Sequence, residues 1–395
     1  MNRLDINGFH LITSFLTPLE IKRLGICTKQ NKEMCKHFMT YSYNEHGCDE
    51  NYTKMKHIKW IVEDCAEDMF NDISNKQLNA YKITFHNKFN PQINALSTHT
   101  QLQQLTFGRD FNQSIDVLPS CTRLQHLAFG WRFNQPICAL SICTQLQQLT
   151  FGGNFNQHID ALSNCTQLQQ LTFGRDFNQH VDALSNCMQL QQLTFGDNFN
   201  QHIDALSNCT QLRRLHFGFR FNQPINALSN CTQLRRLHFG FRFNLPINAL
   251  SNCTQLQKLT FGIFFIRLIG TRSDYMRIQA PTFEGNYNQP IDALSTCTQL
   301  RQLTFGDKFD RPIDVLSNCT QLQRLTFGRE FNQPIKVLSN CTQLQQLTFG
   351  FYFNQLIHAL AKCAQLKKIF FHEKMKNNIN MLQDGLSELM VEYFN

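Results

Sequence analysis

Large apolar residues recur along most of this chain at a fixed spacing of 22 residues. One position of the repeat is always Phe, without an insertion or deletion, at residues 85, 107, 129, 151, 173, 195, 217, 239, 261, 283, 305, 327, 349 and 371. A second series starts at Phe89 and is broken only by Tyr287 and Met375. Such a register predicts a solenoid in which each repeat contacts equivalent residues of its neighbours.

The pattern inside one repeat predicts a short strand. Leu102, Leu105 and Phe107 read L-x-x-L-x-F, which ends in an alternation of period two before Gly108. The return path, as in DALSNC, begins with an Asp or Asn suited to an N-cap, so we predict one helical turn on the outer face. A 22-residue period lies in the leucine-rich-repeat range. We therefore predict an α/β solenoid, a leucine-rich-repeat-like stack of about 14 coils with one parallel sheet.

Cys and Asn recur in register with the Phe. Stacked Cys about 5 Å apart could be bridged, but we predict free, inward-facing thiols that act as small apolar filler. They stand at residues 121, 143, 165, 187, 209, 231, 253, 297, 319, 341 and 363. The Asn after the second Phe, as at Asn112, is predicted to form one buried column that bonds to turn backbone and neighbouring amides. Residues 265–287 keep the 22-residue spacing and are predicted to be a degenerate coil, not an inserted domain.

The formal net charge of the 395 residues is +8. A mildly basic body suits acidic partners or nucleic acid, or is simply a solvated repeat surface. Asp5 interrupts the N-terminal apolar stretch, which therefore does not read as a secretory signal, and no segment approaches a membrane span. The expectation is a cytoplasmic protein with no membrane partner.

Variation between repeats marks a candidate binding surface. The two residues between the strand's Gly and the next Phe change in almost every coil, whereas scaffold positions barely change. We place them on the rim of the concave face, where they serve recognition or, alternatively, reflect drift at exposed positions. The candidate partner-binding residues on this rim and on the adjoining strands are Trp131, Arg132, Arg213, Arg214, His216, Phe219, Arg220, Arg235, Arg236, His238, Phe241, Arg242, Phe351 and Tyr352.

The densest group of these candidates lies in two neighbouring coils, at 213–220 and 235–242. Arg and aromatic residues anchor protein interfaces and suit acidic or phosphorylated segments, whereas a local charge without a groove-reading element disfavours nucleic acid. His158, His180 and His202 could converge on a metal, but no carboxylate or Cys completes a ligand set, which favours exposed turn residues. We find no nucleophile–base pair and no phosphate loop, so we expect neither catalysis nor a cofactor.

The motif Phe-Asn-x-Pro-Ile, intact in several repeats, identifies a resemblance to a known family. It stands at Phe133–Ile137, Phe221–Ile225, Phe243–Ile247 and Phe331–Ile335. Residues 81–380 resemble FNIP repeats, which are known chiefly from giant viruses and social amoebae and are usually treated as relatives of leucine-rich repeats. The resemblance implies a repeat domain that binds other proteins.

The N-terminal stretch LDINGFHLITSFLTPLEIKRLGICTK resembles an F-box, the helical module that docks on the Skp adaptor of cullin ubiquitin ligases. Residues 17–20 form a capping box with Pro at the first helical position. The resemblance implies a helical domain over 1–45. It assigns adaptor binding to Leu4, Phe9, Ile12, Phe15, Leu16, Pro18, Ile21 and Leu24. Alternatively, these helices only cap the open end of the sheet.

Two further helices complete the predicted organisation. Residues 46–80 are expected to link the parts through a helix over 52–73 that covers the first coil, and 381–395 to form a C-terminal cap helix. The combined resemblances imply a non-catalytic substrate receptor, in which the F-box binds the ligase adaptor and the repeats bind a target. The alternative is a pure interaction scaffold, or a decoy that blocks a host protein.

Overall fold

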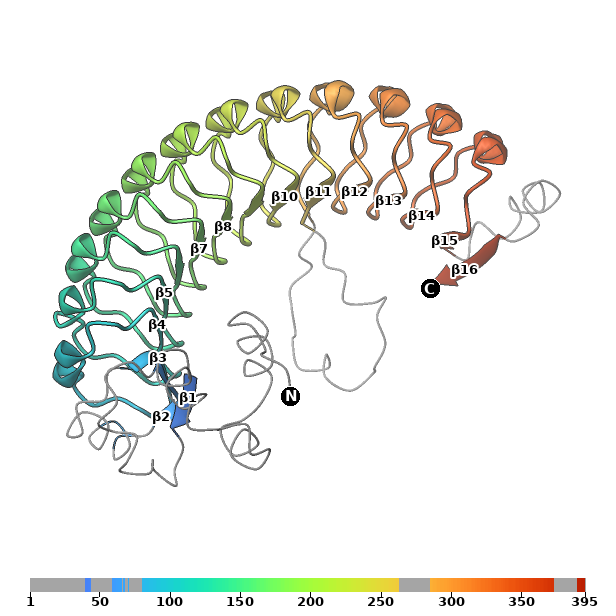
Figure 1. The fold of residues 1–395 in the computed structure, drawn as a ribbon. Helices are drawn as coiled ribbons and strands as arrows, with labels where there is room; N and C mark the ends of the chain where they lie inside the picture. Colours follow the sequence, from blue (N-terminus) through green and yellow to red (C-terminus); the bar gives the residue numbers. More distant parts are fainter. Residues whose placement is uncertain are drawn as a thin grey trace, which may run out of the picture. The chain divides into compact units, whose positions relative to one another are not determined.

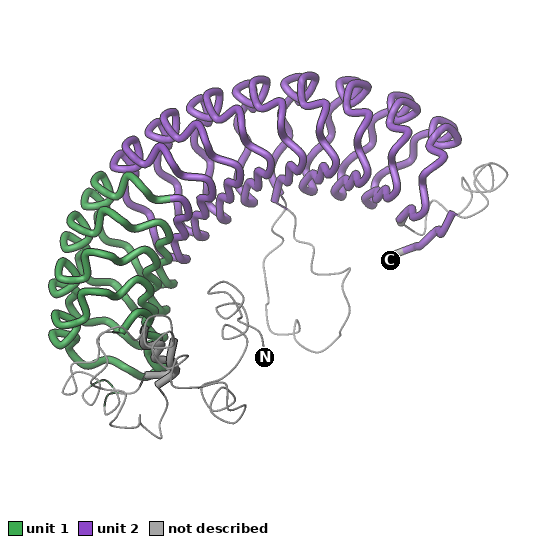
Figure 2. The backbone as a smooth tube through the Cα atoms, viewed as in Figure 1, with its two compact units in different colours: residues 1–168 green, residues 169–395 purple. Residues whose placement is uncertain are grey.

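The computed structural model describes residues 40–43, 59–65, 67, 70, 80–262, 285–372 and 389–394. The chain divides into two compact units, 1–168 and 169–395, which have separate colours in Figure 2. Within each unit, successive coils contribute a short strand on one side and a single turn of 3-10 helix on the other (Figure 1).

In unit 1 each strand pairs in parallel with the next strand in sequence. The strands are β1 (Thr40–Tyr43), β2 (Lys59–Cys65), β3 (Ala80–Phe85), β4 (Gln104–Thr106), β5 (His126–Ala128) and β6 (Gln148–Thr150). The 3-10 helices are η1 (Asn94–Thr98), η2 (Leu118–Ser120), η3 (Cys138–Ile142) and η4 (Asp160–Asn164).

Unit 2 repeats the same arrangement, again with parallel neighbours. Its strands are β7 (Gln170–Thr172), β8 (Gln192–Thr194), β9 (Arg214–His216), β10 (Arg236–Phe239), β11 (Lys258–Phe261), β12 (Gln302–Thr304), β13 (Arg324–Thr326), β14 (Gln346–Thr348), β15 (Lys368–His372) and β16 (Met390–Phe394). Its 3-10 helices are η5 (Asp182–Asn186), η6 (Asp204–Asn208), η7 (Asn226–Asn230), η8 (Asn248–Asn252), η9 (Asp292–Thr296), η10 (Asp314–Asn318), η11 (Lys336–Asn340) and η12 (His358–Lys362). The predicted solenoid with a parallel sheet is confirmed.

The two Phe series form the core. The ring of Phe217 stacks on Phe221 of its own coil at 3.7 Å and on Phe239 of the next coil at 5.7 Å. Aromatic pairs of this kind add about 0.5–1.5 kcal/mol each beyond the apolar area that they bury. Because each coil supplies one face of every stack, neighbouring coils stabilise one another.

The Cys and Asn columns take the predicted roles. Cys209 is buried and free, and its thiol donates to the Leu184 carbonyl at 3.5 Å. Burial raises the pKa of Cys209 to about 11. The backbone N–H of Asn222 donates to Oδ1 of Asn200 at 2.8 Å, which links one coil to the next. This Asn column is only partly buried, however, so its burial was predicted wrongly.

A glycine after each strand lets two coils approach at backbone distance. A Cβ on Gly240 would lie 1.7 Å from the carbonyl oxygen of Gly218, and the same overlap recurs at Gly130 against Gly108. No side chain fits there, so the recurrent Gly is required by stacking as well as by the end of the strand.

The return path forms the predicted single helical turn, which is a 3-10 turn and lacks the predicted side-chain cap. In η4, the N–H of Leu162 donates to the Ile159 carbonyl at 2.8 Å, a bond that spans three residues. Ile159 occupies the N-cap and no side chain caps the helix, so Asp160 is the first helical residue and not the cap. Short helical segments such as this five-residue turn are often 3-10 helices, whose hydrogen bonds span three residues, whereas those of an α-helix span four.

The predicted linking helix and C-terminal cap helix are wrong over the strands that the structure describes, whereas Glu67 and Phe70 are helical as predicted. Residues 59–65, inside the helix predicted over 52–73, form β2, and residues 390–394 of the predicted cap helix form β16. Both segments are rich in β-branched and aromatic residues, and each meets an open sheet edge whose backbone groups need partners. Phe70 does cover the first coil as predicted, since its ring packs edge-on against Phe85 at 5.2 Å.

The coils on either side of the degenerate repeat pair directly with each other. Strand β11 pairs directly with β12, so Lys258 faces Gln302, two repeats further along the chain. Stacking this coil would place Arg272 in the slot of Leu250 and Pro281 in that of Leu259. A buried unpaired charge is costly, and Pro cannot donate a sheet hydrogen bond. The direct pairing of β11 with β12 avoids both costs.

Candidate functional site

The outward face of the sheet in unit 2 changes character at β9 and β10. In each strand the central Leu is buried and the flanking residues face outward. Strand β8 shows Gln192 and Thr194 there, whereas β9 shows Arg214 and His216. The register pairs each of the latter with an identical residue on β10, Arg214 with Arg236 and His216 with His238. The sheet therefore builds a row of Arg beside a row of His.

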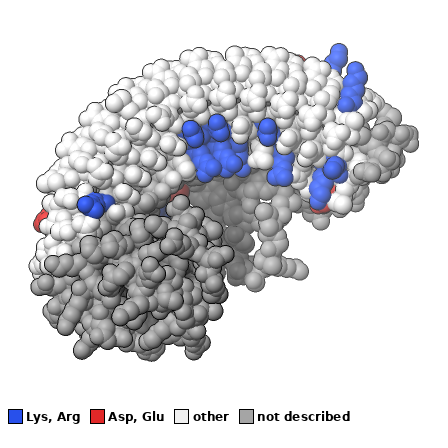
Figure 3. Space-filling view, viewed as in Figure 1, with Lys and Arg blue, Asp and Glu red and all other residues white. Residues whose placement is uncertain are grey.

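We call this surface the basic patch and define it as Arg213, Arg214, His216, Arg235, Arg236, His238 and Lys258. Figure 3 shows Lys and Arg gathered on this part of the molecule. The structure thus brings together six predicted candidates. It adds Lys258, which faces Arg236 across β10 and β11. A comparison of this slot across adjacent repeats, where Arg214, Arg236 and Lys258 follow Gln192, would have found Lys258 from the sequence.

Two shallow depressions border the Arg row. The smaller one, about 200 Å³, is lined by all four Arg of the patch together with Gln191, Gln192 and Gln257. The larger one, about 510 Å³, follows the His side of the row and is lined by Arg214, His216, Arg236, His238, Lys258 and neighbouring strand residues. Cationic groups and hydrogen-bond donors therefore dominate the smaller depression, whereas Leu193, Leu215 and Leu237 also line the larger one.

Few neighbouring groups compensate the positive charges of the guanidinium groups in the patch. Arg214 donates from Nη1 to Oε1 of Gln192 at 3.4 Å. Within the described ranges, no carboxylate forms an ion pair with the four Arg or Lys258. Elsewhere the scaffold does pair such groups, as Lys308 with Glu330 at 2.6 Å. Adjacent strands lie about 4.8 Å apart, so the like charges on β9 and β10 repel one another.

The two His rings of the patch are stacked on each other. Their centroids are 4.3 Å apart and their planes differ by 4°. Burial lowers the pKa of His238 to about 4, and the nearby charges of His216 and Lys258 act in the same direction. Shielding by its neighbours also lowers the pKa of His216, while the carboxylate of Asp197 opposes that shift. His238 is thus neutral at pH 7 and serves as a hydrogen-bonding group.

The rim next to the patch is more buried than predicted. Phe219 and Phe241 stack at 5.1 Å, and the guanidinium of Arg242 lies 5.7 Å from the Phe219 ring. Phe241 is only 7% exposed, so its prediction as a solvent-exposed anchor is wrong. Aromatic residues at equivalent positions of adjacent coils stack on each other just as the core Phe do. Arg220 and Arg242 keep exposed side chains.

The remaining rim candidates lie outside the basic patch. In unit 1, Trp131 is 46% exposed and its ring covers Gly153, while Arg132 pairs with Asp110 at 3.4 Å. In unit 2, Phe351 and Tyr352 follow β14 and meet edge to face at 4.9 Å. Arg329 lies 5.6 Å from each of these two rings. These groups are separate small surfaces.

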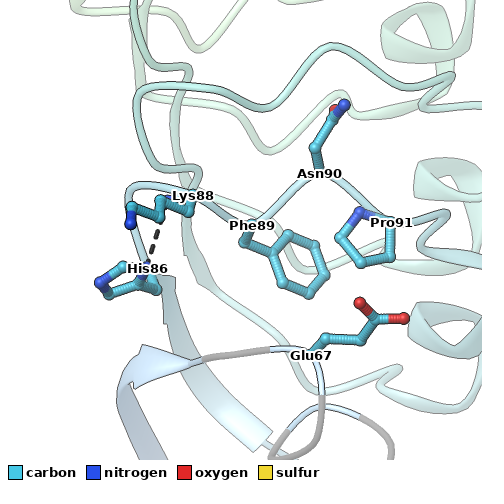
Figure 4. A pocket seen from close by; sticks show the side chains of 6 residues that line it. All are labelled: Glu67, His86, Lys88, Phe89, Asn90 and Pro91. Atoms are coloured by element: carbon cyan, nitrogen blue, oxygen red, sulfur yellow. Dashed lines mark hydrogen bonds between the residues drawn. The ribbon is translucent and has the colours of Figure 1, made fainter.

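A further pocket of about 410 Å³ in unit 1 offers no comparable chemistry. It is lined by Glu67, His86, Lys88, Phe89, Asn90 and Pro91. In Figure 4 the Glu67 carboxylate points away from His86. Nδ1 of His86 accepts a hydrogen bond from the Lys88 backbone N–H at 3.1 Å.

Other predicted sites add nothing to this surface. His158, His180 and His202 are exposed, and the described part of the chain holds no group of three or more His, Cys, Asp or Glu placed to bind a metal. Over the same residues, no helix is long and apolar enough to cross a membrane. The eight predicted adaptor-binding residues, from Leu4 to Leu24, lie outside the described ranges.

No family model and no curated protein matches this chain. Solved structures do match it. An internalin (InlF) from Listeria monocytogenes is 20% identical, with a TM-score of 0.60 over 87% of this chain and 89% of the internalin. A leucine-rich-repeat protein from Leptospira interrogans is 10% identical, with a TM-score of 0.66 over 87% and 92%. The fold is that of leucine-rich-repeat proteins. The plant peptide hormone receptor RGFR1, solved with RGF2, is 13% identical, with a TM-score of 0.56 over 91% and 64%.

Proposed function

We propose that this chain is a non-catalytic interaction protein that holds a protein partner on the outward sheet face of its repeats. The observation that carries this proposal is the basic patch, where four Arg and Lys258 lie together without an ion pair to any described carboxylate. Groups of like charge this near to one another repel, and a partner of opposite charge relieves the repulsion. The structural neighbour RGFR1, which is solved in complex with RGF2, supports a binding role for such a fold.

Site-specific crosslinking tests where the partner binds. A photoreactive amino acid at Thr260, on the sheet face, should crosslink to one dominant protein in cells that express the chain. The same group at Ser229, on the outer turn η7, is the matched control and should give little product. Equal crosslinking from both positions would show that the sheet face is not the binding surface.

The finer proposal is that the chain is a substrate receptor of a Skp–cullin–F-box ubiquitin ligase. Its support is the F-box-like sequence of residues 1–45 ahead of repeats of FNIP type. Residues 1–45 would bind the adaptor, and the repeats would bind the target. A pure scaffold, or a decoy that blocks a host protein without ubiquitination, is the second candidate.

Binding to a purified Skp-type adaptor separates these two candidates. The full chain should bind the adaptor, and Ile12→Asp with Leu16→Asp should abolish binding while the unfolding transition of the repeats stays unchanged. An apolar position that docks into a partner does not tolerate a carboxylate without its own pairing group. If a chain without residues 1–45 still captures the adaptor, the F-box assignment is wrong and the scaffold remains.

A further inference from the structure

The smaller depression of the basic patch has a composition that the scaffold does not require. Gln191 and Gln192, at the start of β8, occupy the slots that Arg213 and Arg214 hold at the start of β9. The Gln strands pair in the same register as the Arg strands, so the fold forms with either residue. The four Arg therefore add repulsion, and the hydrogen bond from Arg214 to Gln192 of the preceding coil, at 3.4 Å, is long.

The number of hydrogen-bond donors in this depression identifies the kind of anion that fits. Each guanidinium offers five N–H donors in a planar fork, and the Gln amides add more. A single carboxylate carries one negative charge and can satisfy one or two of these forks. A phosphate monoester has three terminal oxygens and a charge of about −1.5 to −2 at pH 7. It therefore balances and bridges two pairs of Arg better than a carboxylate does.

We infer that the smaller depression binds the phosphate group of a phosphorylated serine or threonine of a partner protein, with the flanking residues of that partner in the larger depression. The larger depression is open and about 510 Å³ in volume, and it continues from Arg214 and Arg236 toward His238 and Lys258. The neutral His rings and the Thr hydroxyls beside them can bond to the partner's backbone. This inference rests on the proposed function, since it names the partner's chemistry.

The surroundings of the patch fit nucleic acid less well. Single-stranded nucleic acid needs exposed aromatic faces on which successive bases stack. The aromatic rings next to the patch, Phe219 and Phe241, already stack on each other, and Arg242 lies over the Phe219 ring. The first outward slot returns to Gln at Gln192 on one side and Gln302 on the other, so the row of cations is short.

The test uses the full chain and three fluorescent peptide pools of random sequence around a fixed central residue, which is phosphoserine, Glu or Ser. Fluorescence anisotropy should show about tenfold tighter binding of the phosphoserine pool than of the Glu pool, the factor expected for one additional charge-assisted hydrogen bond. Replacing Arg213, Arg214, Arg235 and Arg236 with Gln should weaken phosphoserine binding at least about tenfold. The control replaces Arg301 and Arg324 with Gln, both exposed and outside the depression, and should change binding less than about twofold.

Each other outcome overturns the inference. Equal binding of the Glu and phosphoserine pools would mean that the patch takes acidic segments in general. Stronger competition by single-stranded DNA of equal charge would mean a nucleic-acid surface. Unchanged binding in the variant with four Gln would place the site elsewhere. The proposed function fails separately, when Thr260 yields no selective crosslink, and it survives if only the phosphate preference is absent.

Discussion

Deleting residues 263–284 should leave the solenoid folded and at least as stable as the parent chain. The deletion joins Gly262 to Gly285, so that the chain continues as Gly-Gly-Asn-Tyr. Residues 152–155 read Gly-Gly-Asn-Phe at the equivalent place of an intact coil. The shortened chain therefore keeps the repeat register, although it loses 22 residues.

The contacts at the junction show why little stability should be lost. The N–H of Asn286 donates to the Phe241 carbonyl at 3.0 Å, and in the intact coil Asn154 donates to Trp131 at 2.9 Å. The ring of Tyr287 stacks on Phe261 at 3.8 Å, as the second Phe of a coil does. Holding together the two ends of a 22-residue connection costs roughly 2.7 kcal/mol of chain entropy. Removing it should raise the free energy of unfolding by between zero and about 3 kcal/mol.

Urea denaturation followed by circular dichroism measures the effect. A matched control deletes residues 274–295, which are equal in number but include the buried Tyr287, Ile291 and Leu294. We expect that control to unfold at much lower urea, because each lost core side chain costs about 2–5 kcal/mol. A clearly lower midpoint for the 263–284 deletion would refute the direct pairing of β11 with β12.

Three further experiments test the core and the patch. In the native protein, the thiols of the buried Cys column should resist alkylation and exposed Cys138 should react; mass spectrometry that finds the column labelled would reverse the assignment of its side. Gly240→Ala should lower the free energy of unfolding by about 1–3 kcal/mol or more in urea titrations, because its Cβ would overlap the Gly218 carbonyl; an unchanged midpoint would contradict that close approach. Burial holds the pKa of His238 near 4 in the folded protein, so the unfolded chain takes up this proton first as the pH falls. Between pH 7 and pH 4.5 the free energy of unfolding should therefore fall by roughly 1–3 kcal/mol more for the parent than for His238→Thr. Equal acid sensitivity of the two proteins would contradict the lowered pKa.

The repeat made most of the fold predictable from the sequence. A strict 22-residue period fixes which positions face inward, because every coil must bury the same slots against its neighbours. The ends of the solenoid have no period to follow. There an unpaired sheet edge favoured strands β2 and β16 over the predicted helices. The direct pairing of β11 with β12 was predictable in principle, since Arg272 and Pro281 do not suit the slots that the spacing assigns to them.

The candidate site was predicted only in part, because contacts between adjacent coils decide which rim side chains are exposed. Comparison within a coil marks Phe241 as an exposed anchor, but stacking between coils buries it against Phe219. Comparison within a coil also overlooks Lys258, which becomes notable only beside Arg236. In a parallel stack the unit of recognition is the row across strands, so adjacent coils must be considered together.

The width of the basic patch limits what it can hold. In the first outward slot the cations run through Arg214, Arg236 and Lys258, and Gln192 and Gln302 bound them. Three strands at a spacing of about 4.8 Å give a row roughly 10 Å long. An extended peptide rises about 3.3 Å per residue, so the row spans about three or four residues. The direct pairing of β11 with β12 sets one of these limits, because it places Gln302 beside Lys258. The row matches one short anionic segment of a protein, and longer polyanions would extend beyond it.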